Sequence, residues 1–165
     1  MLRPFPLSIN PLCTFVLPLC AFVVKNYKKI ENQNGYMKQR IAHISIIVRD
    51  YDEAIEFYTQ KLHFRLVEDT KLSESKRWVL LAPPGSDGCC LLLAKAANEE
   101  QKSRIGNQTG GRVFLFLYTD NFKRDYKNLI DNQIKIIREP SVESYGTVAV
   151  FEDLYGNLWD LIQPV

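Results

Sequence analysis

The closing segment of the chain, FEDLYGNLWDLIQPV, places a carboxylate in an unusual sequence context. The letters YGN mark a turn. After this turn, Asp160 interrupts the apolar run from Leu158 to Ile162. A charged carboxylate in a buried strand costs free energy unless a partner compensates it. Asp160 is therefore a candidate metal ligand, a candidate member of a polar network, or a residue that faces solvent on an edge strand.

The cysteines and histidines do not form the pattern of a structural zinc site. No two cysteines are spaced as CxxC, and two histidines are too few to complete such a site. Adjacent cysteines in the strand-like run CCLLLAK should point to opposite faces of a strand. We interpret the thiols as buried and reduced, as in cytosolic proteins. The residues concerned are Cys13, Cys20, Cys89, Cys90, His43 and His63.

Length and composition indicate one soluble domain. The chain has 165 residues, of which 46% are hydrophobic and 24% charged, so it can bury a core and is not globally disordered. A net charge of +2 is too small to indicate a nucleic-acid partner. The sequence contains neither GxxxxGK[ST] nor GxGxxG, so nothing points to a phosphate-binding loop.

The first 36 residues differ in character from the rest of the chain. No residue from Pro4 to Val24 is charged, but four prolines in that stretch oppose a regular helix. Three interpretations stay open for residues 1–36: an unstructured or non-native extension with translation starting at Met37, a membrane anchor, or a cleaved signal. We assign residues 37–165 to the folded domain and expect it in the cytoplasm.

From residue 38 the sequence reads as a strand, a helix and three strands, and then the same again. RIAHISIIVRD alternates, with Ile44, Ile46 and Val48 on one face and His43 on the other. YDEAIEFYTQKL repeats apolar residues at helical spacing, and three strand-like runs follow it. These patterns predict an α+β fold with one module at about residues 38–95, a linker at 96–110 and a second module at 111–165.

Two motifs resemble the vicinal oxygen chelate family, which includes glyoxalase I, bleomycin resistance proteins and extradiol dioxygenases. A helix motif of the type FYxxxLGF corresponds to FYTQKLHF, where His63 takes the glycine position and should adopt a left-handed conformation. A closing motif of the type DPDGNxxEL corresponds to DLYGNLWDL. The resemblance implies paired βαβββ modules that form a curved mixed sheet around a cleft, often in a homodimer.

The resemblance also implies where metal ligands would lie. The four ligand positions of metal-using members fall on His43, Leu92, Arg112 and Asp160. Only His43 and Asp160 can donate to a metal, since leucine has no donor and the guanidinium of arginine stays protonated. Catalytic sites normally need three protein ligands. We therefore expect no metal cofactor; if a divalent metal does bind, His43 and Asp160 are its candidate ligands.

The same positions suggest a different arrangement in the cleft. Because the family brings these positions together, we expect Arg112 and Asp160 to form a buried ion pair near His43. Phe114 and Phe116 would lie on the same face of the predicted strand as Arg112 and would flank it. The candidate ligand-binding residues are thus His43, Arg112, Phe114, Phe116 and Asp160; no catalytic residue is assigned.

Three functions remain under consideration. The first is a metal-independent protein that binds a small molecule and sequesters a toxic compound. The second is a metal-dependent enzyme, either a lyase of the glyoxalase I type or a dioxygenase, in which His43 and Asp160 recruit a third donor such as Glu143, Glu152 or a residue of a partner subunit. The third is an accessory domain that acts through its dimer surface.

Overall fold

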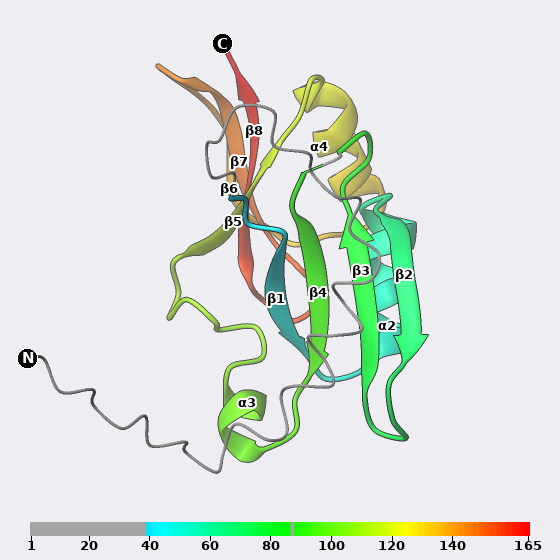
Figure 1. Ribbon diagram of the computed structural model, residues 1–165. Coiled ribbons are helices and arrows are strands. Elements are labelled where there is room, and N and C mark those ends of the chain that lie inside the picture. The colour runs from blue at the N-terminus through cyan, green and yellow to red at the C-terminus, as the bar shows by residue number, and fades with distance from the viewer. Residues whose placement is uncertain (1–38, 87) are drawn as a thin grey trace, which may run out of the picture. The chain divides into compact units, whose positions relative to one another are not determined.

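The computed structural model describes residues 39–86 and 88–165, and in them the predicted module occurs twice (Figure 1). The first module consists of β1 (His43–Val48), α2 (Tyr51–Glu56), the π-helical turn η2 (Phe57–Lys61), β2 (Arg65–Lys71), β3 (Arg77–Ala82) and β4 (Cys90–Lys95). The second consists of β5 (Val113–Tyr118), α4 (Phe122–Asp131), β6 (Ile136–Glu143), β7 (Gly146–Glu152) and β8 (Leu158–Pro164). A short helix, α3 (Glu99–Ser103), lies between the modules in the sequence. The expectations for residues 1–36 lie outside the described residues.

Each module forms one four-stranded mixed sheet. The strand orders are β1-β4-β3-β2 and β5-β8-β7-β6, so the two sheets have the same topology. The pairs β1–β4 and β5–β8 are parallel, and the other neighbouring strands are antiparallel. The prediction of an α+β fold with paired βαβββ modules is confirmed. None of the helices in the described residues is long and apolar enough to cross a membrane.

Side-chain caps and left-handed residues set the helix ends. The Asp50 carboxylate accepts hydrogen bonds from the backbone N–H of Asp52, at 2.9 Å, and of Glu53, at 3.4 Å, and so begins α2. Asn121 caps α4 in the same way, through the N–H of Arg124 at 3.0 Å. His63 has a φ of 58°, which confirms the left-handed conformation predicted for the glycine position of the helix motif.

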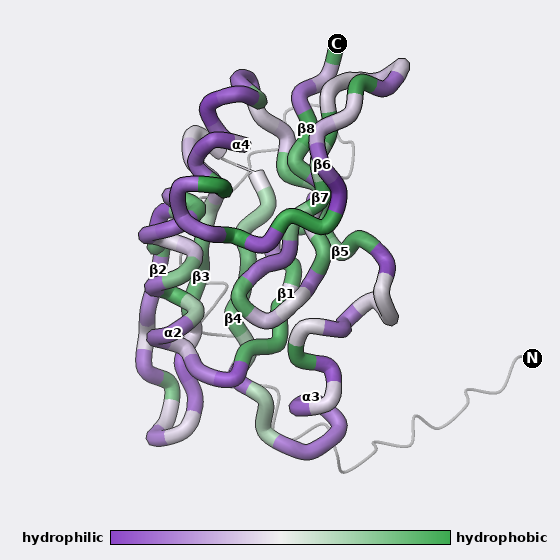
Figure 2. The backbone as a smooth tube through the Cα atoms, turned by 180° about the vertical axis from the view of Figure 1, so that it is seen from behind, coloured by the Kyte–Doolittle hydropathy of each residue, from purple (hydrophilic) through white to green (hydrophobic). Residues whose placement is uncertain are grey.

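One hydrophobic core is shared by the two sheets and the helical segments, with α2 packed against β3 and β4 and α4 packed against β7 and β8. It takes alternate residues from the first sheet, among them Ile46 and Leu93, and alternate residues from the second, among them Phe151 and Leu161. The ring of Tyr58 from the first module packs 6.1 Å from that of Trp159 in the second. Figure 2 shows that β1 and β4 are largely hydrophobic, whereas the outermost strand β2 is largely hydrophilic. Each sheet therefore has one face on the shared core and one face turned away from it.

The turn before β8 is organised by a single buried carboxylate, Asp153. Its Oδ1 accepts the backbone N–H groups of Tyr155, Gly156 and Asn157 at 2.9–3.0 Å. Its Oδ2 accepts from the Tyr58 hydroxyl at 2.8 Å, from Asn157 Nδ2 at 2.9 Å and from the indole of Trp159 at 3.3 Å. Burial and the Asp153 charge raise the pKa of Tyr58 well above its usual value. The closing sequence motif thus fixes where β8 begins, and with it the position of Asp160.

The linker is attached to both modules. Gln108 accepts a hydrogen bond from the backbone N–H of Ile47 at 2.5 Å and donates one to the carbonyl of Ser45 at 3.2 Å, so it pairs with the edge of β1. Gly106 lies against the closing turn, and a Cβ at this position would be 1.9 Å from the carbonyl oxygen of Tyr155. Both contacts hold β1 close to the turn that precedes β8.

Candidate functional site

Asp160 lies in the middle of the second sheet, on the face that points away from the core. Its neighbours along β8, Trp159 and Leu161, belong to the core, so alternation turns Asp160 to the other face. Across the sheet it is in register with Phe116 on β5 and with Val150 on β7. The prediction that this acid is buried is confirmed, because only 8% of Asp160 is exposed.

The Asp160 carboxylate has no hydrogen-bond partner among the described residues, and its Oδ1 is shielded from solvent. Loss of hydration raises the pKa of this carboxyl, and the positive charge of Arg138 opposes the increase only in part. A buried acceptor without a donor is unusual in a native protein and requires an explanation. The expectation that Asp160 is paired is therefore wrong for the described part of the chain.

Arg112 is not the partner of Asp160. It precedes β5, which begins at Val113, and its side chain is exposed. Its backbone N–H and carbonyl hydrogen-bond with Thr109 in the turn that contains Gly110 and Gly111. The predicted buried ion pair is thus corrected: the chain reaches the sheet one residue too late for Arg112 to lie in it.

The two phenylalanines of β5 have different environments. The register of β5 against β8 shifts between Val113 and Leu115, and this irregularity breaks the simple alternation. Phe114 packs against the core. Phe116 is 62% exposed and lies opposite Asp160. Only Phe116 of this pair is therefore placed beside the acid.

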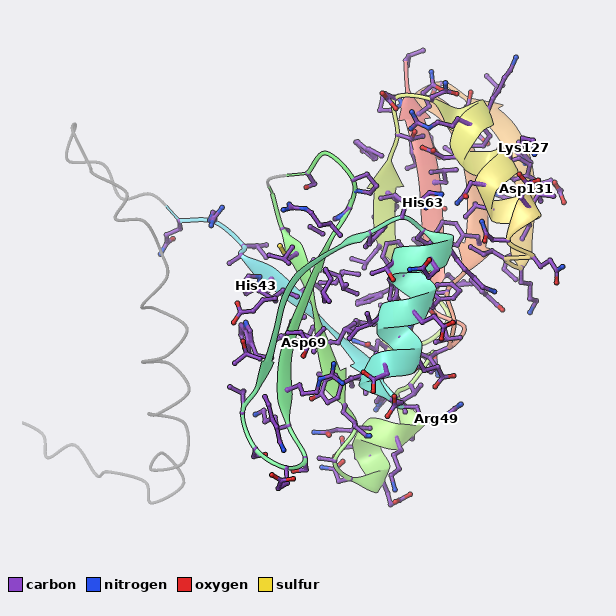
Figure 3. All side chains as sticks on the ribbon, turned by 90° about the vertical axis from the view of Figure 1, so that its right-hand side faces the viewer. His43, Arg49, His63, Asp69, Lys127 and Asp131 are labelled. Atoms are coloured by element: carbon purple, nitrogen blue, oxygen red, sulfur yellow. The ribbon has the colours of Figure 1, made fainter. Side chains whose placement is uncertain are left out.

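His43 lies on the outward face of the other sheet. It begins β1, is in register with Cys90 on β4, and its ring contacts the edge of Trp78 at 5.8 Å between centroids. Figure 3 shows α2 between the strands of the first sheet and those of the second, with His43 on the side of the first sheet away from α2. His43 and Asp160 thus lie on the outward faces of two different sheets.

The donor set does not fit the family's metal site. No three His, Cys, Asp or Glu side chains of the described residues are grouped so that they could hold a metal ion. Leu92 is in register with Ser45 on β1 and brings no donor. The suggested third donors have other partners, since Glu152 pairs with Lys135 at 3.0 Å and Glu143 accepts from Ser141 at 2.9 Å. Even two chains that brought His43 to Asp160 would combine only two donors at these positions.

His63 contributes to a contact between the modules. Its Nε2 lies 2.9 Å from the Asn128 side-chain oxygen of α4, and Asn128 donates to the carbonyl of Lys61 at 2.7 Å. Both residues line a cavity of about 600 Å³ between the end of η2, the β3–β4 turn and α4. His63 thus links the end of the first module's helical segment to α4 of the second module.

Two residues of the outward face were not found from the sequence. Arg138 on β6 is in register with Val150 and is the cation that acts on Asp160. Tyr118 on β5 is in register with Ile162 and is 69% exposed. The alternation of β5 could have indicated Tyr118. Arg138 could not be placed in this way, because β6 shifts its register on both sides of it.

Known proteins are similar to this chain in sequence and in fold. An uncharacterized protein of Shewanella frigidimarina (strain NCIMB 400) is 62% identical over 128 residues, which are 77% of this chain and 95% of the relative. The crystal structure of UcmS2 superposes with a TM-score of 0.67 at 29% identity, covering 76% of this chain and 98% of the other. TnmS3, an antibiotic binding protein from Streptomyces sp. CB03234, superposes with a TM-score of 0.63 at 26% identity, covering 79% of this chain and all of the other.

The family assignment follows from the sequence profile as well as from the fold. The profile of the Glyoxalase/Bleomycin resistance protein/Dioxygenase superfamily matches residues 40–161, which cover the first module and nearly all of the second. The match contains the helix motif and the closing motif, whose turn Asp153 organises. The chain therefore belongs to the glyoxalase/bleomycin resistance protein/dioxygenase superfamily.

Proposed function

We propose that this protein binds a small organic molecule without a metal ion and acts by sequestering a toxic compound in the cytoplasm. The observation that carries the proposal is the outward face of the second sheet, where Asp160 lies buried and without a donor among apolar residues. Ligand sites combine apolar surface with a few polar groups that fix orientation. The similarity to TnmS3, which binds an antibiotic, favours binding over catalysis.

The outward faces also favour a homodimer. Phe116 and Tyr118 on the outward face of the second sheet are 62% and 69% exposed, so a second subunit packed against this face would bury apolar surface. We propose that the first sheet of one subunit faces the second sheet of the other, so that each dimer encloses two ligand clefts between such faces.

Too few metal-ligating side chains lie at the family's ligand positions, which favours binding of the small molecule without a metal ion. A ligand that donates a hydrogen bond would satisfy Asp160, whereas a metal held by His43 and Asp160 alone would lack the third protein ligand that catalytic sites normally have. Binding energy would then come from the apolar surface and from the buried acceptor.

Metal analysis combined with a binding screen tests the proposal. The natively purified protein should contain less than about one-tenth of an equivalent of divalent metal. A panel of aromatic antibiotics should include compounds that raise its melting temperature with a chelator present. Sedimentation should give the mass of two chains. Retention of one equivalent of metal, lost in His43→Ala, would instead favour the metal-dependent enzyme.

A further inference from the structure

Four side chains form one row across the outward face of the second sheet. Arg138 on β6 is in register with Val150 on β7, Val150 with Asp160 on β8, and Asp160 with Phe116 on β5. Neighbouring strands are about 4.8 Å apart, so the Cα atoms of Arg138 and Asp160 are separated by about 10 Å. The row therefore presents a cation, an apolar residue, an acid and an aromatic ring in that order.

The two charged members of the row do not satisfy each other. No ion pair or hydrogen bond joins the Arg138 guanidinium to any of the described residues, and its side chain is exposed. Asp160 has no donor and is almost completely buried. Val150 stands between the two residues. The face thus has an exposed donor group and a buried acceptor group that both lack a hydrogen-bond partner among the described residues.

The rest of the face is apolar and aromatic. The next row contains Tyr118, Ile162, Val148 and Ser141 in register. Phe116 and Tyr118 are 62% and 69% exposed and do not belong to the core. Exposed aromatic rings side by side on one strand offer a stacking surface for a flat apolar group.

We propose that this face selects a zwitterionic ligand: an aromatic molecule that donates a hydrogen bond from an ammonium group to Asp160 and presents a carboxylate to Arg138. The inference rests on the proposed function and names the ligand class. A hydrocarbon would leave the buried acceptor without a donor, which costs free energy. A simple anion would satisfy Arg138 only, and a simple cation would satisfy Asp160 only.

Four related dipeptides test the class. Glycyl-tryptophan carries both end charges, its amide only the ammonium, its N-acetyl derivative only the carboxylate, and the doubly blocked form neither. Calorimetry should show that each end charge tightens binding by a factor between about 10 and about 150, since a hydrogen bond to a charged group contributes about 1.5–3 kcal/mol. Arg138→Gln should remove the preference for the free carboxylate, and Asp160→Asn the preference for the free ammonium.

Controls separate the possible outcomes. Arg112→Gln removes an equally exposed arginine outside the row and should change none of the four affinities. Arg138 is exposed, so its variant provides a test even if Asp160→Asn does not fold. Equal affinities for the four dipeptides, or no binding of any of them, would overturn the ligand class. The proposed function would then still be decided by the antibiotic panel and the metal analysis.

Discussion

The hydroxyl of Tyr58 donates a 2.8 Å hydrogen bond to Asp153, a residue 95 positions further along the chain. This bond joins the helical segment of the first module to the turn that begins the last strand of the second. It lies in the core, where both partners are buried. The helix motif and the closing motif of the sequence therefore meet in a single contact.

Tyr58→Phe should destabilise the protein by about 1.5–3 kcal/mol, because it removes a hydrogen bond to a buried charged acceptor. Urea unfolding followed by circular dichroism measures the change. Tyr126→Phe is the matched control, since its hydroxyl donates to Glu139 at an exposed position. If Tyr58→Phe lowered the free energy of unfolding by less than about 0.5 kcal/mol, as is expected for the control, the role assigned to Asp153 would be contradicted.

Asp160→Asn should stabilise the protein at neutral pH by about 1–3 kcal/mol, because it removes a buried charge that has no partner. The pKa of Asp160 is raised in the folded state, so the folded protein holds the proton more tightly than the unfolded chain. Stability of the natural protein therefore falls as pH rises through the raised pKa. The advantage of the variant should be small in acid and should increase with pH.

Urea unfolding at several pH values measures this difference. Asp131→Asn, at an exposed residue paired with Lys127, should change stability by less than about 0.5 kcal/mol at neutral pH. A variant of Asp160 that is less stable than the natural protein at neutral pH would show that the carboxylate has a stabilising partner.

Gly106→Ala should destabilise the protein by more than about 2 kcal/mol. The added Cβ would meet the carbonyl oxygen of Tyr155, and the φ of 74° is unfavourable for other residues. Gly110→Ala has a similar φ of 64° but no atom within 4 Å of its Cβ, so it should cost only about 1 kcal/mol. Thermal unfolding of both variants compares them directly. Equal losses would mean that backbone strain, rather than the contact with Tyr155, limits position 106.

Phe116→Ala and Tyr118→Ala should weaken ligand binding by about tenfold each, with little effect on stability. Both rings are mostly exposed, so their loss removes stacking surface for a ligand but no core packing. Calorimetry with the best compound of the antibiotic panel measures the effect. Tyr145→Ala, at a tyrosine that is 53% exposed in the β6–β7 turn, should leave the affinity unchanged. Unchanged affinity in all three variants would exclude this face as the binding surface.

The sequence by itself determined the two modules, the left-handed His63 and the burial of Asp160. The modules follow from apolar periodicity and turn residues, and the burial of Asp160 from its position within an apolar strand. The conformation of His63 follows from the glycine position of the helix motif that the sequence resembles. These features could be predicted because each is decided within a few residues of the chain, and the motifs confirm one another.

Only the tertiary structure decided which side chains lie beside Asp160. Arg112 and Arg138 are both arginines near strands, but β5 begins after Arg112, whereas β6 carries Arg138 into register with Val150. Which side chains meet depends on strand register and on small shifts in it, because one residue of displacement exchanges the faces of a sheet. His43 and Asp160 lie on different sheets, and the alternation of each strand turns each residue to the outward face of its own sheet.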